Sequence, residues 1–206
     1  FKMENKRILV IGGSGYIGQE IVPKLIELNN DVTIMSRHVT RSTQFKTIRG
    51  SVLNKSLLEN IIGHFDLVIY LAAVIRTIKK DLYLNNVTGI RNLIEVMEKI
   101  DKKKLIYFST QNIYINNTGP YGDSKKLCES ILLSSQLDYV IIRPNYVYGI
   151  DKNNDFFKLV YLIKKFKVCP IIGDGKTFFE PINKVDLAKF FIEVLINFTC
   201  SLKTSI

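Results

Sequence analysis

Cysteine and histidine are both scarce in this chain of 206 residues, which contains three cysteines and two histidines. Cys128, Cys169 and Cys200 are odd in number and widely separated, so the sequence indicates neither a disulfide framework nor a metal site. His38 and His64 offer little material for zinc binding or for a catalytic triad. We therefore expect no metal, and a reducing cytoplasmic location is the default for such a chain.

Long apolar runs are also missing. No run reaches the roughly 18 residues that a membrane-spanning helix needs, and residues 1–4 lack the apolar core of a signal peptide. We expect no membrane association. A length of 206 residues with 47% hydrophobic residues suits one domain with a well-buried core.

The net charge of +10 raises the alternative of a nucleic-acid-binding protein. The lysines, however, are spread along the chain, and the densest group, Lys99 with Lys102 to Lys104, falls at an expected helix end. Cations at that position interact favourably with the helix dipole. Attraction of a phosphorylated cofactor and substrate explains part of the excess, so we expect no nucleic-acid partner.

Residues 7–18 carry the most informative stretch, Arg-Ile-Leu-Val-Ile-Gly-Gly-Ser-Gly-Tyr-Ile-Gly. Its apolar run predicts a strand that is buried on both faces, and the apolar spacing from Tyr16 onward predicts a helix. A strand, a glycine turn and a helix start together predict a dinucleotide site, because glycines let the backbone approach a pyrophosphate. The glycines fit two spacings, one that uses Gly13 and one that uses Gly12, and a bare turn is the alternative.

The second predicted strand, residues 32–35, ends at Ser36 and Arg37. An acidic residue at this distance from the glycine turn would hold the ribose 2′-hydroxyl of NAD, but no carboxylate is present. Arg37, helped by Arg41, suits the 2′-phosphate of NADP instead, because a guanidinium matches phosphate oxygens bidentately. We therefore predict NADP ahead of NAD, with an ordinary surface arginine as the alternative.

Strands and helices alternate along the rest of the chain. This alternation predicts an α/β fold, a doubly wound, Rossmann-like parallel sheet with a small C-terminal substrate-side segment. We expect residues 1–149 to form the NAD(P)-binding core and residues 150–206 to pack on the same domain. The further predicted strands are 47–49, 66–71, 105–108, 139–142 and 169–172, and the further predicted helices are 57–62, 82–100, 121–134, 156–167 and 185–197. Residues 199–206 show no usable pattern.

Tyr121 and Lys125 are four residues apart at the start of a predicted helix, so both side chains project from one face. A lysine ammonium and a positive nicotinamide ring would lower the pKa of the phenol, which makes Tyr121 a candidate for proton transfer. Thr110, just past the predicted strand 105–108, could hydrogen-bond the reacting oxygen. The same Tyr-x-x-x-Lys spacing recurs at Tyr148 and at Tyr161, but only Tyr121 follows a strand end that carries hydroxyl groups.

In this order the motifs resemble the extended short-chain dehydrogenases/reductases, the family of NAD(P)-dependent epimerases, dehydratases and reductases. The resemblance rests on residues 12–18, 71–73, 86–89, 109–110, 121–129, 143–149, 172–175 and 185–188. It implies that Thr110, Tyr121 and Lys125 are catalytic. It also implies a set of cofactor-binding residues: Gly12, Ser14, Gly15, Tyr16, Ile17, Gly18, Ser36, Arg37, Val52, Leu71, Ala72, Ala73, Tyr121, Lys125, Pro144 and Asn145.

Some positions depart from the family pattern. Tyr70 stands where many members have histidine, Ser51 replaces an aspartate that contacts adenine, and Phe179 replaces a phosphate-binding arginine. The stretch after Gly149 is also short for a substrate domain. These departures bear on the substrate, so a nucleotide sugar and a similar small molecule both remain open.

The resemblance implies an oxidoreductase or epimerase that acts on a hydroxyl or carbonyl group through a Tyr-Lys-Thr proton relay. A homodimer is a separate expectation. Epimerase, dehydratase and reductase remain alternatives. A non-catalytic NAD(P)-binding sensor or assembly protein is the second class, although such a protein has no need of Lys125. RNA binding, the third class, rests on net charge alone.

Overall fold

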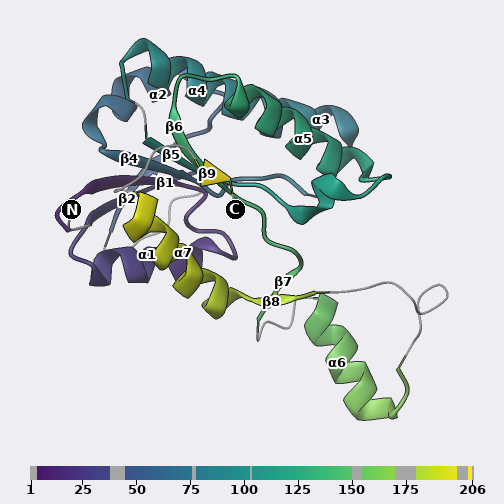
Figure 1. Ribbon diagram of the computed structural model, residues 1–206. Coiled ribbons are helices and arrows are strands. Elements are labelled where there is room, and N and C mark those ends of the chain that lie inside the picture. The colour runs from purple at the N-terminus through teal and green to yellow at the C-terminus, as the bar shows by residue number, and fades with distance from the viewer. Residues whose placement is uncertain are drawn as a thin grey trace.

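A computed structural model of the chain describes residues 4–37, 45–75, 78–102, 104–149, 155–169, 180–198 and 204–205 (Figure 1). Several positions used in the sequence analysis lie outside these ranges. They include His38, Arg41, Phe179, Cys200, the segment 172–175 and, except for Cys169, the predicted strand 169–172.

The main sheet is parallel throughout, with the strand order β3-β2-β1-β4-β5-β6-β9. Its strands are β1 (Arg7–Ile11), β2 (Asp31–Ser36), β3 (Lys46–Arg49), β4 (Leu67–Tyr70), β5 (Lys104–Phe108), β6 (Asp138–Ile142) and β9 (Thr204–Ser205). The first six strands have the order of a doubly wound dinucleotide-binding fold, so the predicted fold class is confirmed. Strand order reverses between β1 and β4, and ligands of such sheets bind at the carboxyl ends of the strands beside this point.

Helices cover both faces of the sheet (Figure 1). On one face lie α1 (Gly18–Glu27) and α7 (Lys184–Phe198), and on the other lie α2 (Lys55–Ile61), α4 (Gly89–Lys99) and α5 (Gly119–Leu133). Successive β1 side chains alternate between the two layers, because Ile8 and Val10 belong to one apolar cluster while Leu9 and Ile11 belong to the other. This two-sided burial explains the unbroken apolar run in β1.

The helix that the sequence predicts over 82–100 differs in detail. It begins earlier, at Lys79, and consists of α3 (Lys79–Tyr83), the π-helical turn η2 (Leu84–Thr88) and α4. At the start of α4, a Cβ on Gly89 would lie 2.5 Å from Val52 Cγ2 and 3.0 Å from the Tyr70 hydroxyl. Glycine therefore lets this helix approach both neighbours closely.

Two pairings in the C-terminal part were absent from the sequence-based prediction. The strand β9 extends the main sheet beside β6, with Val140 opposite Thr204. The strands β7 (Val147–Tyr148) and β8 (Ile182–Asn183) form a separate two-stranded sheet. Two short 3₁₀ turns are η1 (Ile62–His64) and η3 (Gln111–Tyr114).

The two predicted C-terminal helices lie in different surroundings. In α7, Phe191 and Leu195 are fully buried in the cluster that α1 also joins. In contrast, α6 (Asp155–Phe166) projects away from the sheet and its covering helices (Figure 1) and exposes Tyr161 and Phe166. The domain boundary after residue 149 stays a prediction. In the described part of the chain, we find no helix with the length and apolar character needed to cross a bilayer.

Candidate active site

The glycine turn after β1 is built from close backbone contacts. Gly12 has a φ of +83°, and a Cβ there would lie 2.7 Å from the Ala72 backbone nitrogen at the end of β4. A Cβ on Gly18 would overlap the Gly13 carbonyl oxygen. The Gly15 N–H donates to the Gly12 carbonyl over 3.0 Å. The turn therefore needs glycine at residues 12 and 18, where a side chain would collide with the backbone.

The helix α1 starts directly from this turn. Its N-cap residue, Ile17, provides no side-chain hydrogen bond to the first turn. The sequence thus places no capping side chain at the N–H groups of the helix start, which is the arrangement that suits a bound phosphate. This local structure fits the pyrophosphate of a dinucleotide.

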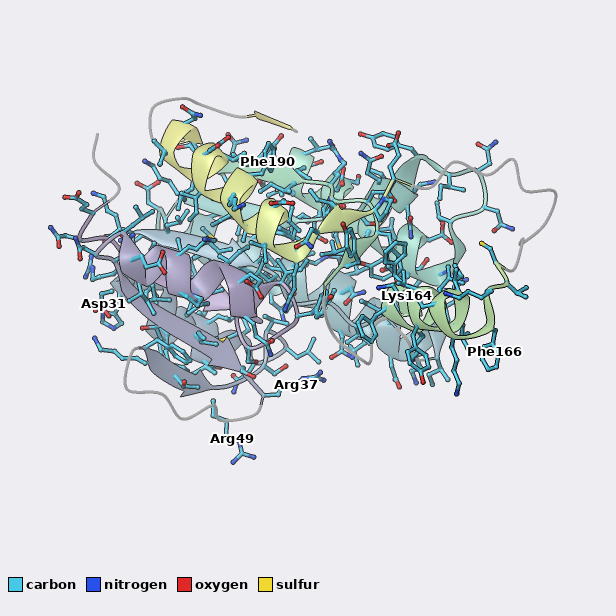
Figure 2. The ribbon with its side chains drawn as sticks, turned by 90° about the horizontal axis from the view of Figure 1, so that it is seen from below. Asp31, Arg37, Arg49, Lys164, Phe166 and Phe190 are labelled. Atoms are coloured by element: carbon cyan, nitrogen blue, oxygen red, sulfur yellow. The ribbon has the colours of Figure 1, made fainter. Side chains whose placement is uncertain are left out.

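Polar side chains gather at the carboxyl end of β2. The hydroxyls of Ser14 and Ser36 lie 3.1 Å apart and join the glycine turn to this strand. Arg37, the next residue, is exposed. The end of β3 brings Arg49, also exposed, into register with Ser36, and Figure 2 shows both arginines at this edge of the sheet. Sequence reasoning missed Arg49, because only strand pairing places it beside Ser36.

The segment after β4 is held by Asn86 of η2. The Asn86 side chain accepts from the Val74 N–H over 2.8 Å and donates to the Val74 carbonyl over 3.0 Å. It also donates to the Ser124 hydroxyl of α5 over 3.2 Å. Asn86 is itself buried and so fixes the course of the chain after Ala72 and Ala73. Its presence in a family-like motif was the available signal, although sequence reasoning gave it no site role.

Val52, another predicted cofactor contact, is half-buried beside α4. Its carbonyl accepts from the Asn92 side chain over 3.1 Å. Leu71 and Ala72 are also half-buried, whereas Ala73 is exposed. These small and apolar residues follow β3 and β4, on the two sides of the glycine turn.

Hydroxyl groups follow β5, as the sequence predicts. Ser109 and Thr110 are both buried, and Thr110 caps η3 by accepting from the Asn112 N–H over 3.3 Å. The Ser109 hydroxyl is buried without a hydrogen-bond partner among the described residues. A buried hydroxyl without a partner is costly, so this atom also fits a site that receives a polar ligand.

The end of β6 lies against the end of β5. The Gln111 N–H donates to the Pro144 carbonyl over 3.1 Å, which brings the predicted residues Pro144 and Thr110 into one neighbourhood. Asn145 uses its side-chain oxygen to accept from the Tyr146 N–H over 2.9 Å. Both Pro144 and Asn145 are half-buried.

A buried ion pair joins α5 to the end of β6. Arg143 donates to Glu129 from Nη2 over 2.8 Å and from Nε over 2.9 Å, and these side chains are 13% and 6% exposed. This bidentate pair fixes the helix that carries Tyr121 and Lys125 relative to Pro144.

Lys125 is almost completely buried, with 2% of its surface exposed. Its Nζ donates to the Phe108 carbonyl over 2.6 Å and to the Tyr107 hydroxyl over 3.0 Å. It also lies 4.5 Å from the centre of the Tyr107 ring. Burial lowers the pKa of Lys125 to about 8, although Cys128 and Glu129 act in the opposite direction.

Tyr121 is half-buried on the same helix. Burial is the main cause that raises the pKa of its phenol to about 12, and Cys128 adds to the effect. The lowering of this pKa by Lys125 together with a bound nicotinamide ring stays a prediction. In this structure the Lys125 ammonium donates to Tyr107 and Phe108.

The other two Tyr-x-x-x-Lys pairs lie elsewhere. Tyr148 belongs to β7 and packs its ring 4.8 Å from that of Phe156, while Lys152 lies outside the described residues. Tyr161 is 55% exposed on α6, with Lys165 beside its ring. Apart from Tyr121 and Lys125 on α5, the predicted site residues lie at or just beyond the carboxyl ends of β1, β2, β3, β4, β5 and β6.

Comparisons with known proteins give the family of this chain. A model of the NAD dependent epimerase/dehydratase family matches residues 8–200. The chain is 28% identical to a dTDP-D-glucose 4,6-dehydratase of Dictyostelium discoideum, an alignment that covers 83% of this chain and 51% of that protein. It is 29% identical to a UDP-glucose 4-epimerase of Lactobacillus helveticus, with 82% and 62% covered. The chain thus spans about half to three-fifths of the length of these two relatives.

A solved structure shows the same fold. The Bordetella bronchiseptica enzyme WbmH, determined in complex with NAD+, superimposes with a TM-score of 0.78 and 21% identity. The superposition covers 94% of this chain and 73% of that one. At this identity the likeness concerns the fold alone.

Proposed function

Because this chain belongs to the NAD dependent epimerase/dehydratase family, we propose that it is an NAD(P)-dependent enzyme acting on a hydroxyl or carbonyl group of a small molecule. The observation that carries the proposal is the position of Tyr121 and Lys125. Lys125 donates to the Phe108 carbonyl, two residues before Thr110, so this pair lies at the strand end that carries the hydroxyl groups.

The chain's own residues would bind and orient the cofactor. The glycine turn at residues 12–18 and the start of α1 would receive the pyrophosphate, and Leu71 to Ala73 would line the bound molecule. Pro144 and Asn145 would lie on the nicotinamide side. When bound, the nicotinamide cofactor supplies or accepts a hydride.

Tyr121 would handle the proton at the substrate oxygen. Burial raises the pKa of the Tyr121 phenol to about 12, so Tyr121 keeps its proton at neutral pH. It would donate that proton to a carbonyl oxygen once nearby positive charge brings its pKa down. In the opposite direction it would act as a base, which requires nearby positive charge to stabilise the phenolate. Thr110 would hydrogen-bond the same substrate oxygen. Lys125 would supply the nearby positive charge.

We propose NADP as the preferred form of the cofactor. Arg37 and Arg49 stand at neighbouring strand ends, beside the Ser14–Ser36 hydroxyl pair. Two guanidinium groups favour a 2′-phosphate, whereas NAD is normally held there by a carboxylate.

The relatives suggest a nucleotide sugar as the substrate class. The names of the Dictyostelium discoideum dehydratase and of the Lactobacillus helveticus epimerase each contain a nucleotide sugar. The homodimer, the cytoplasmic location and the boundary after residue 149 remain predictions. The alternative is a non-catalytic NAD(P)-binding sensor or assembly protein. A proton relay that proves inactive would favour this alternative.

The deciding experiment compares Tyr121→Phe with the parent chain. Nucleotide sugars and small carbonyl compounds are screened with NADPH and NADH, and steady-state rates are then measured on any substrate found. Loss of the phenolic hydroxyl should lower turnover by about 10²- to 10⁴-fold, the usual contribution of a general acid or base. Cofactor binding should barely change.

Tyr148→Phe and Tyr161→Phe are matched controls, because they share the spacing but not the strand-end position. Both should remain within a few-fold of the parent rate. A Tyr121→Phe protein as active as its parent would refute the catalytic assignment. Cofactor that stays bound through purification favours an epimerase, and freely exchanging NADPH favours a reductase.

A further inference from the structure

We propose that Tyr107 is a positioning residue, which holds the Lys125 side chain in place and keeps it in its ammonium form through both its hydroxyl and its ring. This inference rests on the proposed catalytic role of Lys125. Tyr107 itself belongs to β5 and is 1% exposed, so it acts from inside the core rather than from the site.

The geometry of Lys125 supports this role. An ammonium has three N–H donors, and two of the three are accounted for by the Tyr107 hydroxyl at 3.0 Å and the Phe108 carbonyl at 2.6 Å. The ring of Tyr107 adds a cation–π contact at 4.5 Å. Two atoms of β5 and one aromatic face thus define where the amine lies, and one N–H remains for a group on the site side.

Cys128 and Glu129 also raise the pKa of Lys125, but the hydrogen bonds of its amine within the described chain go to Tyr107 and Phe108. Glu129, one turn along α5, directs its carboxylate to Arg143 in a bidentate pair. Burial raises the pKa of the Cys128 thiol, so Cys128 stays neutral near pH 7. The phenols of Tyr70, Tyr107 and Tyr121 also have raised pKa values, mainly through burial. Within the described chain, the direct contacts of the cation are therefore two oxygen dipoles and a π face.

The hydroxyl of Tyr107 is itself oriented. It accepts from Lys125 over 3.0 Å, so an oxygen lone pair is directed toward the amine and the phenolic proton is directed away from it. The Cys128 thiol donates instead to the Asn86 carbonyl over 3.4 Å.

Tyr70 provides a matched control. It is equally buried, at 2% exposure, and its ring centre lies 5.7 Å from that of Tyr107. Within the described chain, the Lys125 amine donates its hydrogen bonds to Tyr107 and Phe108, not to Tyr70. Tyr70→Phe and Tyr107→Phe remove the same atom from two neighbouring core rings, but only Tyr107→Phe removes a partner of Lys125.

The test follows Lys125 directly, by NMR titration of ¹³Cε-labelled lysine in the full chain, with the resonance assigned from Lys125→Arg. We expect Tyr107→Phe to lower the Lys125 titration midpoint by about one pH unit, the scale of one hydrogen bond to a charged group. We expect Tyr70→Phe to leave it within about 0.3 units. Where a substrate is found, the pH profile of kcat should shift with the midpoint, and the substrate KM should stay constant.

Identical midpoints in the parent and in Tyr107→Phe would overturn the proposal. If Tyr107→Phe fails to fold, the parent alone decides, because a Lys125 methylene beside an aromatic face must show an upfield ring-current shift. Absence of that shift would also overturn it. A parent without activity on any substrate would refute the proposed function, while the titration would still judge the role of Tyr107.

Discussion

Lys184 at the start of α7 forms an ion pair with Glu20 of α1, with 2.8 Å between Nζ and Oε1. Its ammonium also lies 5.2 Å from the centre of the Tyr16 ring in the glycine turn. A Cβ on Gly149 would lie 2.7 Å from the Lys184 side chain and 2.9 Å from the Tyr16 hydroxyl. The C-terminal segment is therefore joined to the proposed cofactor loop at this point.

A double-mutant cycle of Lys184→Met and Glu20→Gln should reveal a coupling of about 1 kcal/mol in denaturant unfolding. The pair is partly buried, with side chains 17% and 26% exposed, so water screens it only in part. The control cycle uses Lys189 and Asp186 of the same helix, which are 64% and 65% exposed and should couple by less than about 0.5 kcal/mol. Equal couplings in the two cycles would contradict this prediction.

NADPH should bind more tightly than NADH, by about ten- to a hundredfold, because one charge-assisted pair with the 2′-phosphate is worth that much. Arg37→Asp should reverse the preference, and Arg49→Ala should reduce it. Fluorescence titration with both cofactors measures the ratio of the Kd values. Arg91→Ala, at an exposed position on α4, should leave the ratio unchanged. An unchanged ratio in Arg37→Asp would show that Arg37 does not face the cofactor.

Burial of Lys125 should make stability depend on pH. Its pKa falls from 10.5 to about 8 on folding, so between these values the unfolded chain binds more protons than the folded one. The cost of burying the amine is therefore fully present below about pH 8, on the order of 3 kcal/mol, and it shrinks as pH rises through this window.

Lys125→Met removes this pH-dependent cost. The gain in free energy of unfolding that Lys125→Met shows over the parent should thus be larger at pH 7 than at pH 9.5, by about 2 kcal/mol. Urea unfolding at both pH values measures the difference. Lys126→Met, at the exposed neighbouring position, is the control and should show little change between the two pH values. A Lys125→Met protein with the same relative stability at both values would argue against a buried ammonium.

Neighbouring phenylalanines of α7 should differ sharply in their contribution to stability. Phe191 is fully buried against the sheet, with its ring centre 5.7 Å from that of Phe108. Phe191→Ala should therefore cost about 3–5 kcal/mol of unfolding free energy.

Phe190 is 37% exposed and lies on the outer side of the same helix (Figure 2). Phe190→Ala should cost less than about 1 kcal/mol. Both values come from denaturant unfolding of the full chain. Similar costs at the two positions would show that α7 does not pack on the sheet as described.

Short-range patterns in the sequence determined the strand, turn and helix at residues 7–27. The apolar run of β1 is explained by burial on both faces of the sheet. Glycine is required at residue 18 by the nearby Gly13 carbonyl and at residue 12 by the Ala72 backbone after the adjacent strand β4. The same holds for the common face of Tyr121 and Lys125, because helical spacing alone sets it. These features depend on neighbours in the chain, and the structure has the strand and the helix at Arg7–Ile11 and Gly18–Glu27.

Contacts between distant segments were decided only by the tertiary structure. Tyr107 reads as an ordinary apolar position of a buried strand, and its bond to Lys125 exists because α5 packs against β5. Arg49 lies opposite Ser36 because of the register of β2 and β3. The sequence of β9 shows no strand pattern, and its strand forms by pairing with the edge of β6. The pKa of Tyr121 rises for the same reason, since burial is a property of the packed chain, whereas the spacing of two residues on a helix is a property of the sequence.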